Sequence, residues 1–143
     1  MAFTYTCFAQ DGAPSSLLSS YYNIKDALIA GNQDLAATKA DEFTKAAKSI
    51  DEQTISADKI NTLVKAATAI SQNKDLKQQR LRFADLSTDM ISAVKAAKIW
   101  GQPVYEAYCP MKKAYWLIGE KAIKNPYYGS AMLTCGKVAE TIN

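Results

Sequence analysis

The chain has 143 residues, a length typical of one domain and sufficient to bury about 68% of the surface that the unfolded chain exposes. Apolar residues make up 48% of it and the formal net charge is +3, so composition and charge do not indicate a nucleic-acid or membrane-surface partner. No run reaches about 18 consecutive apolar residues, so no transmembrane segment is expected.

Residues 1–12 are expected to be either the stub of an export leader or an extended arm. Thr6-Cys7-Phe8-Ala9 places small residues as at a signal-peptidase site, but too little basic and apolar sequence precedes them for a complete leader. Phe3, Tyr5 and Cys7 alternate with threonines, which is the periodicity of a strand.

Residues 13–101 are expected to form an up-and-down four-helix bundle. Helix starts are predicted after Ser15-Ser16, at Asn32 or Asp34, and at Ser56, because these residue types cap helix N-termini. The fourth helix is predicted from about Lys74 to Trp100, where Gly101 and Pro103 would end it. At ~40 Å it would exceed the others, leaving a surplus on which the C-terminal segment can pack.

Apolar residues recur at helical spacing through this region and predict the inward face of each helix. The predicted inward residues are Leu17, Tyr21, Ile24 and Leu28, then Ala36, Ala40, Phe43, Ala47 and Ile50, then Ile60, Leu63, Ala67 and Ile70, and finally Leu76, Phe83, Leu86, Met90, Val94 and Ala97.

Residues 102–143 are expected to form a small cap on the bundle. Val104–Tyr108 and Tyr115–Ile118 are aromatic and β-branched runs of strand length, which predicts a hairpin or a pair of extended segments. Asn125-Pro126 predicts a turn, and Ala131–Cys135 a single helical turn that Gly136 closes. We therefore expect one mainly α domain over residues 1–143, with this cap as its last part.

The cap carries two thiols and two thioethers in near mirror order, Cys109 and Met111 followed by Met132 and Cys135. Thiolate and thioether sulfurs favour soft ions such as Cu(I), and without histidine the chain is poorly suited to zinc. These four residues are therefore the candidate metal ligands. A Cys109–Cys135 disulfide, worth about 3 kcal/mol by loop-closure entropy, remains an alternative, as do two unrelated buried thiols.

No catalytic arrangement stands out. The absence of histidine excludes Ser-His and Cys-His pairs, and there is no Cys-x-x-Cys motif and no glycine-rich phosphate loop. We therefore expect a binding or interaction protein rather than an enzyme, with no cofactor other than a possible thiophilic metal ion.

The last third of the chain resembles a bacterial domain of unknown function that occurs in exported stand-alone proteins and attached to membrane-fusion (adaptor) subunits of heavy-metal efflux pumps. The helical part resembles it only in pattern. The residues that carry the resemblance are Tyr108-Cys109-Pro110-Met111, Ala114-x-Trp116-Leu117, Ile123-x-Asn125-Pro126-Tyr127-Tyr128-Gly129 and Met132-Leu133-x-Cys135-Gly136.

The resemblance implies a periplasmic or cell-envelope location and a link to copper, silver or mercury. Two hypotheses follow. The first is a periplasmic protein that buffers or delivers Cu(I), or a similar ion, to an efflux system through Cys109, Met111, Met132 and Cys135. The alternative is a non-metal interaction module of the cell envelope, pinned by a Cys109–Cys135 disulfide.

Overall fold

The computed structural model of the protein describes residues 14–97 and 102–142. The interpretations of residues 1–12 as leader or arm, and of Trp100 and Gly101 as a helix end, fall outside the described residues. The described helices are α1 (Pro14–Ile29), α2 (Gln33–Lys48), α3 (Ala57–Ser71) and α4 (Leu76–Ala97), followed by the strands β1 (Val104–Cys109), β2 (Ala114–Ile118) and β3 (Lys137–Ile142), with the 3-10 helix η2 (Gly129–Met132) before β3.

Two of the helices, α2 and α3, begin after the predicted capping residues Asn32 and Ser56, whereas α1 begins at Pro14, before the predicted Ser15-Ser16. The Asn32 side chain accepts a hydrogen bond from the backbone N–H of Leu35 at 3.0 Å, and the Ser56 hydroxyl accepts one from the N–H of Lys59 at 3.4 Å. Both bonds satisfy backbone donors that a helix leaves unpaired in its first turn. The predicted inward positions are confirmed as buried, apart from Ile60, Leu76 and Ala97, which are partly buried against the core.

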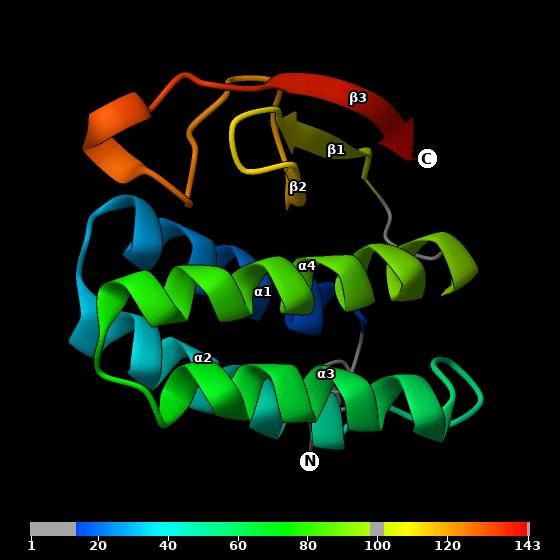
Figure 1. Cartoon of the computed structure of the whole chain (residues 1–143). Helices are drawn as coiled ribbons and strands as arrows, with labels where there is room; N and C mark the ends of the chain where they lie inside the picture. Colours follow the sequence, from blue (N-terminus) through cyan, green and yellow to red (C-terminus); the bar gives the residue numbers. More distant parts are fainter. Residues whose placement is uncertain (1–13, 98–101, 143) are drawn as a thin grey trace, which may run out of the picture.

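The molecule has three layers, which Figure 1 shows one above another: the sheet, then α1 and α4, then α2 and α3. Contacts join α1 to α2, α2 to α3 and α3 to α4, while β2 rests on α4. The inward face of α2 is largely alanine, including Ala36, Ala40 and Ala47, and such small side chains allow neighbouring helices to approach closely.

The prediction of a mainly α fold is confirmed, and so is the hairpin of β1 and β2. A helical bundle with a small cap is nevertheless an incomplete description, because residues 104–142 build a three-stranded antiparallel sheet in the order β2-β1-β3. The third strand was missed. Its pairing with β1 shifts register between Glu106 and Ala107, where Ala139 has no partner on β1, so its side chains do not alternate regularly.

Aromatic side chains fix the sheet to the helices. The Phe83 ring of α4 stacks on Tyr21 of α1 at a centroid distance of 5.0 Å, and contacts Tyr127 at 6.0 Å. The Tyr127 ring in turn meets Trp116 of β2 edge-on at 5.9 Å. The Tyr21 hydroxyl accepts the backbone N–H of Leu117 at 3.0 Å. The sheet is therefore attached to the middle of α4 as well as to its end. The sequence had led us to expect packing at the end alone.

An ion-pair network joins the end of α4 to the sheet. The Nζ of Lys95 lies 3.1 Å from a carboxylate oxygen of Glu106 and 3.2 Å from one of Glu140. These two glutamates face each other directly across β1 and β3, an arrangement that would be repulsive without the lysine between them. Glu106 is only 8% exposed, so the lysine also neutralises a carboxylate that is buried.

Candidate thiol site

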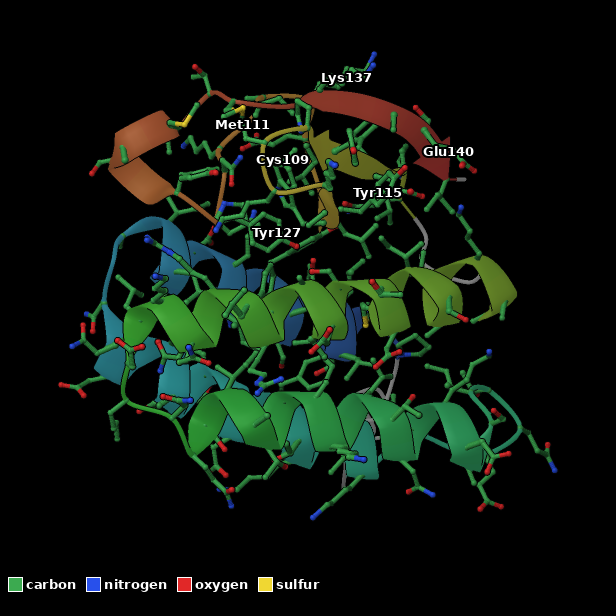
Figure 2. All side chains as sticks on the ribbon, viewed as in Figure 1. Cys109, Met111, Tyr115, Tyr127, Lys137 and Glu140 are labelled. Carbon is green, nitrogen blue, oxygen red and sulfur yellow. The ribbon has the colours of Figure 1, made fainter. Side chains whose placement is uncertain are left out.

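The pairing of β1 with β3 brings the two described cysteines together. Tyr108 lies opposite Lys137, so the next residue of β1, Cys109, reaches the level of the segment that contains Cys135. Both cysteines are free; Cys109 is fully buried and Cys135 partly buried. The two thiols are near enough for their charges to interact and for Cys109 to hydrogen-bond Cys135. In Figure 2, Cys109 and Met111 lie in the sheet layer, with Tyr127 between the sheet and the helices.

The surroundings keep the Cys135 thiol protonated. Desolvation raises its pKa most, and the charge and hydrogen bond of Cys109 raise that pKa further. The backbone N–H of Met111 donates a hydrogen bond to the Cys135 sulfur and lowers the pKa in part. A thiophilic ion would therefore have to displace a proton from this sulfur to bind it.

Asn125 holds the segment that carries Cys135. It is fully buried, and its side-chain amide donates to the backbone oxygen of Cys135 at 2.7 Å and accepts from the N–H of Tyr127 at 2.8 Å. Its backbone N–H donates to Leu133 at 2.7 Å, and its backbone oxygen accepts from Gly129 at 2.9 Å. Sequence reasoning identified Asn125 only as the start of a turn. Its bond to a residue ten positions away gives no local signal.

Two glycines permit the close packing of this segment. Gly136 has a φ of +138°, and a Cβ there would lie 2.9 Å from a ring carbon of Trp116 and 3.0 Å from the backbone oxygen of Tyr108. Gly129 has a φ of +58°, and a Cβ there would lie 2.6 Å from Nη2 of Arg80 and 3.0 Å from the backbone oxygen of Ile29. Only glycine fits such positions without displacing its neighbours.

Replacing Gly129 by alanine should destabilise the protein more than replacing Gly31. Gly31 has a similar φ of +73°, but a Cβ there would meet nothing closer than a Leu76 methyl at 3.9 Å. Gly31→Ala should therefore cost about 1–2 kcal/mol for the left-handed backbone alone, and Gly129→Ala at least about 1 kcal/mol more for the steric overlap. Urea unfolding followed by circular dichroism measures both, and equal losses would contradict the packing described here.

Both candidate methionines are tied to Cys135 through the backbone. The N–H of Met111 donates to the Cys135 sulfur, and the backbone oxygen of Met132 accepts from the N–H of Cys135 at 3.1 Å. Their side chains are accessible, with Met111 62% and Met132 37% exposed. Met90, in contrast, is fully buried in α4, as predicted for a core residue.

The helical turn near Met132 differs from the expected one. It runs from Gly129 to Met132 as a 3-10 helix, two residues earlier than predicted, so Cys135 lies beyond it. The predicted bounds of this turn, Ala131–Cys135, were therefore wrong. Within residues 14–97 and 102–142, no three cysteine, aspartate or glutamate side chains converge as a metal-holding group. A metal site here would therefore consist of two thiols supplemented by thioethers.

Taken together, these features define a mainly α protein with a three-stranded sheet on one side and a pair of adjacent free thiols at the end of that sheet. Residues 17–100 match the family described as "Protein of unknown function (DUF3347)", and the chain belongs to this family. No curated protein and no solved structure matches the chain.

The family match has a boundary that bears on the site. It covers α1 to α4 and stops before β1, so Cys109, Met111, Met132 and Cys135 all lie outside it. The resemblance found from the sequence rested on residues 108–136, whereas the match rests on the helices. None of the helices in the described part of the chain is long and apolar enough to cross a bilayer.

Proposed function

We propose that the protein binds a thiophilic metal ion of the Cu(I) type through Cys109 and Cys135, with Met111 and Met132 as supplementary ligands. The observation that supports the proposal is the closeness of two free thiols that the sequence separates by β2, a turn and the 3-10 helix η2. Two thiolates are a suitable ligand pair for a soft monovalent ion, whereas zinc normally requires four cysteine or histidine ligands.

The arrangement suits an ion that is exchanged rather than enclosed. Cys109 is buried, but Cys135 is only partly so, and the two methionines are exposed, Met111 in the turn after β1 and Met132 at the end of η2. An incoming ion can therefore meet thioether sulfur at the surface before it reaches the thiols. We place this activity in the periplasm or cell envelope, where the protein would buffer the ion or deliver it to an efflux-pump adaptor, because the C-terminal segment resembles proteins with that association.

Titration of the reduced protein against a chromophoric Cu(I) chelator under anaerobic conditions tests the proposal. The parent should bind one ion per chain. Cys109→Ser and Cys135→Ser should each weaken Cu(I) binding by more than ~100-fold, because loss of a ligand should cost more than loss of a residue that only supports a ligand. Cys7→Ser, which removes the third cysteine of the chain, is the matched control and should have no effect. If both serine variants compete for Cu(I) as well as the parent, the site does not exist.

The methionines are tested in the same assay. Met111→Leu and Met132→Leu should each weaken binding less than the cysteine variants, because a thioether carries no charge. Met90→Leu is the control, because it makes the same substitution in the buried core. Such a volume-conserving exchange costs less than about 1.5 kcal/mol of stability, and it should leave the Cu(I) affinity unchanged.

Cu(I) affinity should rise with pH. The pKa of Cys135 lies above its ordinary value, so this thiol is protonated at neutral pH and the ion must displace its proton. The apparent affinity is then expected to increase about tenfold per pH unit for the proton displaced from Cys135, and to level off once that thiol ionises. Competition titrations between pH 6 and 8 measure this slope, and an affinity independent of pH over that range would contradict thiolate ligation.

The alternative function is a non-metal interaction module of the cell envelope in which the same two thiols form a disulfide. The contact between Cys109 and Cys135 favours it as well, because a disulfide joins cysteines that already lie side by side. Intact mass spectrometry of aerobically purified protein separates the two functions. A deficit of two hydrogens, with loss of thermal stability on reduction, supports the module, whereas free thiols that take up Cu(I) support the metal site.

A further inference from the structure

A second feature of the molecule is a cavity of about 510 Å³ between the first half of α4 and the turns that follow β1 and precede η2. We call it the α4 cavity. Its walls are largely apolar and aromatic, and include Leu81, Ala84, Tyr127 and Tyr128. Leu81 is 47% exposed at its edge and adds to this apolar surface. Small-molecule sites typically have volumes of about 300–1,000 Å³ and mostly apolar walls.

The charged side chains of the α4 cavity are mainly cationic. Lys77, Arg80 and Lys112 line it against the single carboxylate of Asp75, which already accepts a hydrogen bond from the N–H of Gln78 at 3.3 Å. Within the described part of the chain, none of the three cations has a carboxylate within ion-pair distance. The lining of the cavity therefore carries an excess of positive charge, three cations against one carboxylate.

Two of the three cations, Arg80 and Lys112, are held in place by contacts with the rest of the protein. Nη2 of Arg80 donates to the backbone oxygen of Leu28 at 2.7 Å, and its Nε–H is buried without an acceptor among the described groups. The Nζ of Lys112 lies 5.3 Å from the centre of the Tyr128 ring, which keeps this lysine over the aromatic wall.

A second cavity of similar size provides a comparison. It has a volume of about 500 Å³ and is lined by two lysines, Lys25 and Lys124, and two carboxylates, Asp26 and Glu120. Its charges are balanced, and Lys25 and Asp26 already form an ion pair at 3.3 Å. Volume therefore does not distinguish the two cavities, whereas uncompensated positive charge does.

We propose that the α4 cavity binds a small amphipathic organic anion, with its apolar body against Leu81, Ala84 and Tyr127 and its acidic group between Lys77 and Lys112. The apolar walls provide affinity by burying hydrocarbon, and the unpaired lysines select the sign of the head group. The site is distinct from the thiol site, because none of its lining residues is a candidate metal ligand, although Lys112 directly follows Met111.

Decanoate and decyltrimethylammonium are suitable probes, since they share a hydrocarbon tail and differ in the sign of the head group. Each is titrated into the metal-free, full-length protein labelled with ¹⁵N, and amide chemical shifts are followed by NMR. Decanoate should bind saturably and shift the amides around the α4 cavity, while the cationic probe should bind at least tenfold more weakly. Equal binding of the two probes, or decanoate shifts that spread over the whole molecule, would overturn the proposal.

Three variants test separately whether decanoate binding depends on the charge of the α4 cavity and on its open volume. The double variant Lys77→Gln, Lys112→Gln should weaken decanoate binding roughly fivefold, the effect of losing two exposed ion pairs. Lys25→Gln, Lys124→Gln makes the same change in charge at the second cavity and should leave the affinity unchanged. Ala84→Leu keeps every charge but fills the α4 cavity, and should weaken binding at least tenfold. Unaltered affinity in either the Lys77/Lys112 variant or Ala84→Leu contradicts the assignment.

Discussion

Replacing Trp116 by alanine should lower the free energy of unfolding by about 3–5 kcal/mol, the range for removal of a large buried aromatic side chain. Trp116 is completely buried in β2, its ring meets Tyr127 edge-on, and the chain at Gly136 passes directly over it. Its removal would leave a void between the sheet and the segment that carries Cys135. Urea unfolding should be followed by far-ultraviolet circular dichroism, because the substitution removes one of the two tryptophans of the chain.

Two variants make the Trp116 result interpretable. Tyr115→Ala alters the adjacent residue, which is 41% exposed, and should cost much less. Trp116→Phe should fall between the two, since it loses volume but also removes an indole N–H that is buried without a partner among the described groups. A Trp116→Ala variant no less stable than Tyr115→Ala would show that the sheet does not depend on this contact.

Replacing Asn125 by alanine should cost about 2–4 kcal/mol, because it leaves the partly buried carbonyl of Cys135 and the buried N–H of Tyr127 without their hydrogen-bond partner. The loss should also be local. Amide hydrogen exchange is expected to accelerate in residues 125–136 more than in the helices, because this segment depends on Asn125 for its conformation.

Asn32→Ala is the matched control for Asn125. Asn32 caps α2 with a single side-chain hydrogen bond to Leu35, so its loss should cost only about 1 kcal/mol and leave exchange in residues 125–136 unchanged. If the two alanine variants are equally stable, Asn125 does not organise the thiol-bearing segment.

The helical part of the fold could be predicted because its signals are local. Asn32 and Ser56 begin helices in the structure as their side-chain chemistry predicts, and most of the predicted inward residues are buried. The third strand could not be predicted in the same way. It forms only by pairing with β1, and its bulge opposite Glu106 and Ala107 interrupts the alternation that marks a strand in sequence.

The sequence indicated which residues to consider for the candidate site, but not which contacts bring the two cysteines together. The spacing of Cys109 and Cys135 in the sequence gave no reason to expect that strand pairing would bring them together. Aromatic contacts do hold the sheet to α4 through Phe83 and Tyr127, but the register of β1 and β3 is what aligns the cysteines. The role of Asn125 was missed because the bond it makes to Cys135 is a tertiary contact rather than a turn preference.

The order β2-β1-β3 gives the two sulfurs unequal freedom. Cys109 ends the central strand, with Ala114 of β2 beside it and α4 beneath the sheet, so its sulfur is a rigid point of reference. Cys135 ends a connecting segment that is attached mainly through Asn125 and a few backbone bonds. The proposed metal site could therefore adjust its sulfur separation to ions of different radius only through residues 129–136, and its selectivity would then depend on the stiffness of that segment rather than on the strands.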